Sequence, residues 1–104
     1  MQAFLALGDD TRREIIEALA GREHSVSDIV GRFAISQPAV SQHLRVLREA
    51  GLVRVRPVGQ RRLYSVDPAG LRVIEDWLDR YRRKVARTLD GLERYLDESK
   101  EQQP

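Results

Sequence analysis

The chain has 104 residues, of which 41% are hydrophobic, and a formal net charge of only +2. This length suits one compact domain and is short for two. The absence of cysteine excludes disulfides, thiol redox chemistry and thiolate metal sites. No apolar run reaches about 18 residues and no basic-then-apolar leader is present, so we expect a cytoplasmic protein with no membrane partner.

The first third of the chain predicts three short helices. Residues 2–7 can form the first, and Asp10 is expected to cap a second helix that ends just before Gly21. In SVSDIVGRF, Ser25 is expected to cap a third helix, and the carboxylate of Asp28 complements its dipole. The helical segments therefore follow one another with little chain between them.

A fourth predicted helix has two chemically different faces. Ser36 caps it, Pro38 is tolerated in its first turn, and Gly51 stops it after Ala50. Its apolar residues recur at helical spacing and face the core: Val40, Leu44 and Leu47. The other face carries amides, hydroxyls and guanidinium groups, which suit base edges in a DNA major groove. These side chains are Ser36, Gln37, Ser41, Gln42, Arg45 and Arg48. Two helices at about residues 26–50 are typical of a helix-turn-helix.

The segment after this helix predicts a β-hairpin at about residues 53–66. LVRVRPV alternates apolar and basic residues, Gly59 and Gln60 offer a turn, and RRLYSV returns as a second strand. As the wing of a winged helix, the hairpin can bring arginines to DNA phosphate or the minor groove. These arginines are Arg54, Arg56, Arg61 and Arg62. The alternative is an edge hairpin whose charges only prevent aggregation.

Positive charge is concentrated in this part of the chain. Residues 37–64 hold six arginines and one glutamate, a net charge of +5. Residues 1–36 hold four basic and six acidic residues, and residues 65–104 hold eight basic and nine acidic residues. The distribution favours a polyanionic partner such as double-stranded DNA. The alternative is a solvated surface without a partner.

The last third predicts one long amphipathic helix, at about residues 68–98. Asp67 caps it, Pro68 is favoured in its first turn, and its length is roughly 45 Å. Packing against the first helix of a twofold mate would bury its apolar stripe and place two recognition helices about 34 Å apart. The expected homodimer interface comprises Phe4, Leu71, Ile74, Leu78, Tyr81, Val85, Leu89 and Leu92. The alternative is a helix that folds back on its own domain.

Together these elements predict a mainly α fold with a small β-hairpin. A single winged helix-turn-helix domain is expected over residues 1–98, followed by a polar tail at 99–104.

The two histidines of the chain give little indication of a function. His43 flanks the apolar stripe, where a hydrogen-bonded structural imidazole is favoured over a DNA contact or pH switch. His24 is expected in a polar loop without a role.

Several of these segments resemble the ArsR family of bacterial winged helix-turn-helix repressors. Residues 36–66, SQPAVSQHLRVLREAGLVRVRPVGQRRLYSV, are similar to the family's recognition helix and wing, and GDDTRREIIEALA is similar to an upstream helix. The likeness runs from about Ala3 to Leu96, and Asp10 stands where the family usually has proline. The resemblance implies base-reading roles for four residues of the fourth helix and wing contacts for two arginines: Gln37, Ser41, Gln42, Arg45, Arg61 and Arg62.

The chain departs from the family where many members bind a metal. The stretch EHSVSDI has Ser25 and Ser27 where those members have thiolates, and no histidine follows His43 to form the family's second site. We therefore expect no metal and no cofactor, as in the metal-independent SdpR-like branch. The resemblance implies a repressor that responds to an unidentified small molecule or partner protein, or that regulates its own operon.

Two other functional classes have less support. An enzyme would need a nucleophile, a base and oxyanion donors together, and the chain has no such pattern and no glycine-rich phosphate loop. A winged-helix adaptor that binds proteins and no specific DNA is the stronger alternative, because a fold does not fix a function. The prediction is a homodimeric, sequence-specific repressor acting on a palindromic operator.

Overall fold

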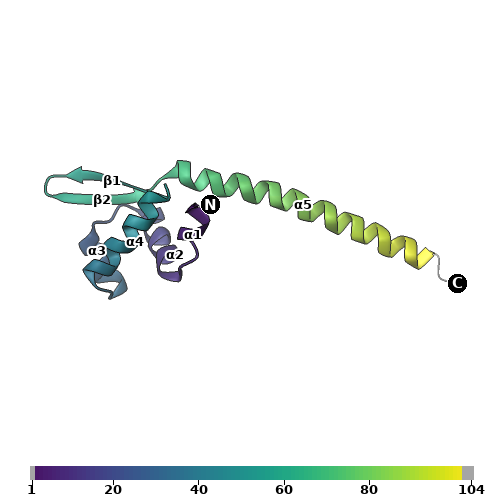
Figure 1. The fold of residues 1–104 in the computed structure, drawn as a ribbon, viewed down its shortest axis with the longest axis horizontal. Helices are drawn as coiled ribbons and strands as arrows, with labels where there is room; N and C mark the ends of the chain where they lie inside the picture. The colour runs from purple at the N-terminus through teal and green to yellow at the C-terminus, as the bar shows by residue number, and fades with distance from the viewer. Residues whose placement is uncertain (1, 102–104) are drawn as a thin grey trace. The chain divides into compact units, whose positions relative to one another are not determined.

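The computed structural model describes residues 2–101 and has the predicted fold class, mainly helical with one antiparallel hairpin (Figure 1). The elements in chain order are α1 (Gln2–Ala6), α2 (Asp10–Gly21), α3 (Val26–Phe33), α4 (Gln37–Glu49), β1 (Val53–Val58), β2 (Arg61–Val66) and α5 (Pro68–Glu101). Contacts divide the chain into one unit that ends at Ile74 and another that begins at Glu75. The expected single domain over residues 1–98 therefore stays a prediction.

Helix α2 begins and ends one residue away from the predicted positions. Asp9 is its N-cap and accepts a hydrogen bond from the Arg12 amide at 3.0 Å, so the expectation for Asp10 was wrong. The two adjacent aspartates have the same capping chemistry, and the sequence alone does not decide between them. Gly21 is the last residue of the helix, and Arg22 is the C-cap.

Helices α3 and α4 begin at the predicted caps. Ser25 and Asp28 form a reciprocal capping box at the start of α3. Ser36 caps α4 by accepting a hydrogen bond from the Ala39 amide at 3.3 Å. Between the helices Ala34 adopts a left-handed conformation with φ 53°, which tightens the connection. Together α3 and α4 form the helix-turn-helix.

The hairpin has the predicted strands and turn. Its register pairs Val53 with Val66 at the base and Val58 with Arg61 at the tip. Gly59 has φ 61°, which suits the first position of a two-residue type II′ turn.

His24 lies beside this hairpin instead of in a polar loop, so that expectation was wrong. It is buried and forms a two-bond antiparallel bridge with Tyr64 of β2. This pairing joins residues 40 positions apart in the sequence, so no local sequence pattern predicts it.

The core lies among α1 to α4 and the base of the hairpin. Its largest fully buried side chains are Ile15, Ile29, Val40, Leu44, Leu47 and Leu52. The three apolar residues predicted for α4 are all in this group, and each buried side chain of this size contributes about 1.5–3 kcal/mol. Burial of this stripe fixes which face of α4 points away from the core.

Helix α5 continues without a break to Glu101, past the expected end near residue 98. The first residues of the expected tail are therefore helical, and residues 102–104 lie outside the described part. Leu71 and Ile74 pack against the core of their own unit. No helix within residues 2–101 has the length and apolar character needed to span a bilayer.

Candidate nucleic-acid interface

The face of α4 opposite the core is open to solvent. All six side chains predicted to read DNA are exposed: Ser36, Gln37, Ser41, Gln42, Arg45 and Arg48. Arg45 donates a hydrogen bond to the Glu49 carboxylate one turn on, with Nε and Oε1 3.1 Å apart. Both side chains of this pair are exposed, and such pairs contribute little to stability. The Arg45 guanidinium is therefore held only weakly by Glu49.

The strand register separates the four wing arginines into two sets. Successive strand residues point to opposite faces, and directly paired residues share a face. Arg54 and Arg56 pair with Ser65 and Leu63, so they share one face with Arg61. Arg62 pairs with Pro57 and lies on the opposite face, together with Tyr64. Arg61 and Arg62 were expected to act together at the turn, but they lie on opposite faces of the hairpin.

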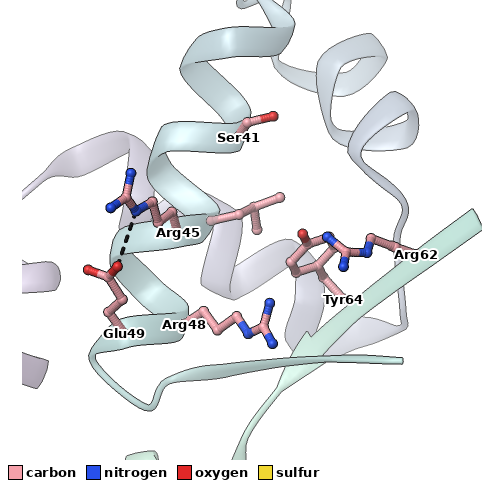
Figure 2. A pocket seen from close by; sticks show the side chains of 7 residues that line it. Ser41, Arg45, Arg48, Glu49, Arg62 and Tyr64 are labelled. Atoms are coloured by element: carbon pink, nitrogen blue, oxygen red, sulfur yellow. Dashed lines mark hydrogen bonds and ion pairs between the residues drawn. The ribbon is translucent and has the colours of Figure 1, made fainter. Parts of the chain in front are cut away.

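A groove of about 460 Å³ lies between α4 and β2. Its lining includes three arginines and one glutamate, so it is basic. The lining residues are Ser41, Leu44, Arg45, Arg48, Glu49, Arg62 and Tyr64. Figure 2 shows the side chains of Arg48 and Arg62 pointing toward one another across the groove, near Tyr64. Predicted residues of the helix and one predicted residue of the wing are thus brought to one surface.

The other wing arginines contact residues of their own chain. Arg56 donates from Nε and Nη2 to the two carboxylate oxygens of Glu23, both at 2.7 Å. Arg61 donates to the Ser25 hydroxyl at 3.1 Å and to the Asp28 carboxylate at 3.3 Å. Arg54 reaches the Ser65 hydroxyl at 3.4 Å.

These contacts shift the pKa values of the groups involved. The hydrogen bonds from Arg56 lower the pKa of Glu23, and the same contact raises the pKa of Arg56. The pKa of Asp28 is lowered mainly by the hydrogen bonds from Ser25, with a smaller contribution from Arg61. Both carboxylates are therefore charged at neutral pH.

A hydrogen-bonded imidazole was expected for His43, but one of its two ring nitrogens has no hydrogen-bond partner among residues 2–101. Its Nδ1 is buried and has no partner among residues 2–101, and the ring as a whole is half-buried. The pKa of Asp9, the N-cap of α2, is lowered mainly by the hydrogen bond from the Arg12 amide.

Apolar side chains remain exposed along α5. Of the predicted dimer residues, five have exposed fractions between 36% and 54%: Leu78, Tyr81, Val85, Leu89 and Leu92. The other three, Phe4, Leu71 and Ile74, are half-buried. Trp77 stacks on Tyr81, with ring centroids 5.2 Å apart, and both remain exposed.

Three functional candidates were missed in the sequence analysis. Tyr64 lines the groove, and its spacing of two from Arg62 could have placed both on one strand face. Glu23 and Asp28 contact wing arginines 33 residues away in the sequence, and no local spacing indicates such pairs.

The helix-turn-helix followed by a hairpin defines this chain as a winged helix-turn-helix protein, and its relatives give the family. Residues 9–55 match the family described as "Bacterial regulatory protein, arsR family". The chain is 44% identical over 96 residues to the HTH-type transcriptional regulator Rv2034 of Mycobacterium tuberculosis, covering 92% of this chain and 87% of that protein. It is 35% identical over 75 residues to the transcriptional repressor SdpR of Bacillus subtilis, covering 72% and 83%.

Solved structures agree with this relationship. An ArsR-like transcriptional regulator from Rhodococcus sp. RHA1 superposes with a TM-score of 0.81 at 30% identity, covering 93% of this chain and 89% of that one. The homodimeric winged helix-turn-helix DNA-binding domain of Mb0332 from Mycobacterium bovis gives a TM-score of 0.64 at 26% identity, covering 75% and 76%. The chain belongs to the arsR family of bacterial regulatory proteins and is a transcriptional regulator. Its relatives are regulators and not enzymes, in agreement with the prediction.

Proposed function

We propose that the chain is a homodimeric, sequence-specific repressor that occupies a palindromic operator in the bacterial cytoplasm. The observation that carries this proposal is the groove whose lining includes Arg45, Arg48 and Arg62. In it, side chains of a solvent-exposed helix face and of a wing line one basic surface. That combination matches a recognition helix in the major groove with an adjacent backbone contact.

The roles of individual residues follow from side-chain chemistry. Gln37 and Gln42 can pair with adenine, Arg45 and Arg48 with guanine, and the hydroxyls of Ser36 and Ser41 with either base. Arg54 and Arg62 are the wing arginines proposed to contact the DNA backbone. Their guanidinium groups are exposed and make no ion pair with an acid in residues 2–101.

The proposed repressor works without the metal site of many family members. Ser25, which the resemblance aligns with a metal-binding thiolate, uses its hydroxyl to cap α3 and to accept a hydrogen bond from Arg61. Soft and borderline metals prefer thiolate and imidazole ligands, so this hydroxyl does not fit them. We infer that release from DNA depends on another effector, a small molecule or a protein.

A second copy of the chain is proposed to cover the apolar residues of α5. The exposed positions run from Leu78 to Leu92 and would be costly to leave in water along their whole length. A twofold mate buries the same surface on both copies and presents two recognition helices to two half-sites. The homodimeric state of the Mycobacterium bovis domain supports this arrangement.

Substitution of Arg45 and Arg62 tests the proposed DNA contacts. We expect Arg45→Ala to cost about 1–3 kcal/mol on the preferred duplex and to relax the base preference at one position of each half-site. Arg62→Gln should weaken binding to all sequences alike and lower the salt slope by about one. Fluorescence anisotropy on duplexes with single base-pair changes measures both effects. An equal loss on every duplex for Arg45→Ala would show that Arg45 contacts phosphate and does not read a base.

A further inference from the structure

The segment from Glu23 to Asp28 lies along the edge of β2 that β1 does not use. The His24 amide donates to the Tyr64 carbonyl at 3.1 Å, and the Tyr64 amide donates to the His24 carbonyl at 2.8 Å. Strand β2 is therefore paired on both edges, with β1 on one side and His24 on the other. The base of the wing is thus held by the residues that lead into α3.

Side chains continue this attachment toward the tip of the hairpin. Glu23 binds Arg56 of β1 through two parallel hydrogen bonds, the geometry in which arginine and carboxylate are most specific for one another. The Ser25 and Asp28 side chains, already joined in the capping box of α3, both accept from Arg61 next to the turn. Each strand of the wing therefore has one arginine side chain that binds the segment before α3 or its first turn, in addition to the backbone bridge at Tyr64.

A two-stranded hairpin needs such an attachment. A pair of strands without further packing is marginally stable in water. Beyond the buried Val53 and Tyr64 at its base, the hairpin becomes exposed, and Val58, Gly59 and Gln60 at the tip are all open to solvent. The contacts of Arg56 and Arg61 with residues outside the hairpin therefore help to restrain its exposed part.

We propose that Glu23 and Asp28 are positioning residues for the wing. They hold Arg56 and Arg61 on the face opposite Arg62, and so fix the place of Arg62 at the groove beside α4. Arg56 and Arg61 then act within the protein, and not on DNA phosphate as their charge alone suggested. This inference rests on the proposed function, because Arg62 is positioned for a DNA contact.

If Glu23 positions the wing, its loss should change DNA affinity in the direction opposite to that expected for the loss of an acidic residue. Removal of an acidic residue near a DNA-binding surface ordinarily strengthens binding, because it reduces repulsion of the phosphates. If Glu23 instead competed with phosphate for Arg56, its removal would free a cation and also strengthen binding. A positioning role predicts that loss of Glu23 weakens binding, since the wing is then less restrained.

Salt-dependent binding of the 104-residue chain to a mixed-sequence duplex of about 30 base pairs shows whether loss of Glu23 weakens or strengthens binding. We expect Glu23→Ala to weaken binding about two- to fivefold, the range open to a well-formed exposed pair. The control Glu17→Ala removes an equal charge from an exposed position of α2 and should not weaken binding. Arg56→Gln should leave the salt slope unchanged, whereas Arg62→Gln should lower it by about one.

A charge exchange gives the matching rescue. Glu23→Arg combined with Arg56→Glu rebuilds the pair in reverse, so we expect it to recover most of the affinity lost in Glu23→Ala. Tighter binding by Glu23→Ala, a salt slope lowered by about one in Arg56→Gln, or no recovery in the exchanged chain would overturn the inference. A wild-type chain without salt-sensitive binding would overturn the proposed function, and the inference with it. Circular dichroism confirms that each variant is folded.

Discussion

Gly70 allows the first turn of α5 to approach the chain that follows α4. A Cβ atom at this position would overlap the carbonyl oxygen of Gly51 and crowd Leu52. Gly51 itself has φ 77°, a conformation that favours glycine. These two glycines bring the start of α5 close to the end of α4.

The substitution Gly70→Ala should therefore lower the stability of the fold. We expect a loss of about 1–3 kcal/mol in the free energy of unfolding, because backbone and not a flexible side chain fills the space. Urea denaturation measures this change. Gly31→Ala is the matched control, since nothing lies within 4 Å of its Cβ position in α3, and better helix propensity should stabilise it by up to about 1 kcal/mol. Equal stability of Gly70→Ala and wild type would disprove the close approach.

Individual residues were predictable where their role is local. Ser25, Ser36 and Pro38 mark helix starts by their own chemistry, and the structure places them as expected. The burial of His24 was not predictable, because it follows from pairing with a strand 40 positions later. The contact of Gly70 with Gly51 is non-local in the same way.

The contacts of the wing with Glu23 and Asp28 should depend on pH. Glu23 and Asp28 have lowered pKa values in the folded chain, so the unfolded chain binds their protons at higher pH than the folded chain does. Their stabilisation is present above the ordinary carboxyl values of 4.5 and 3.8, and it is lost as pH falls through the lowered folded values.

Acidification should accordingly destabilise the wild type more than a chain without the Glu23 carboxylate. We expect the urea midpoint to fall less for Glu23→Gln than for wild type between about pH 6 and pH 3. Glu17→Gln, the charge-matched control on α2, should follow wild type. Parallel pH profiles for all three chains would show that the pair with Arg56 contributes nothing to stability.

The positions of the helices and strands were more predictable from the sequence than the contacts between these elements. Period-two alternation gave both strands and the turn at Gly59, and the apolar spacing gave the buried face of α4. Arg61 and Arg62 were expected to act together because both are basic and flank the turn. The strand register places these neighbouring residues on opposite faces of the hairpin. The acidic partners of Arg56 and Arg61 come from a segment that only tertiary pairing brings near.

Helix α5 should control assembly. Substitution of Leu89 by Gln removes an apolar side chain twice in a twofold dimer, at about 1.5–3 kcal/mol each if it is buried by the mate. We expect sedimentation equilibrium to show a shift from dimer toward monomer. Arg87 lies on the side of the helix opposite Leu89, so the control substitution Arg87→Gln should leave the dimer intact. A monomeric wild-type chain at micromolar concentration, or an unaffected Leu89 variant, would contradict the proposed interface.

The complete molecule is proposed to be two such chains that read one DNA site together. Each chain contributes a basic groove between α4 and β2, and the apolar residues of α5 join the copies. The twofold symmetry of such a dimer requires that the preferred DNA be an inverted repeat. Symmetry of the bound sequence therefore reports both the DNA contact and the assembly.

Selection of bound duplexes from a random-sequence library by the 104-residue chain, at near-physiological salt, measures this symmetry. We predict an enriched inverted repeat whose half-site centres are separated by about one helical turn, or about 34 Å. Absence of any enriched sequence from a folded, dimeric chain would contradict it and favour a winged-helix adaptor that binds proteins. Enrichment of a single asymmetric site would contradict the twofold arrangement.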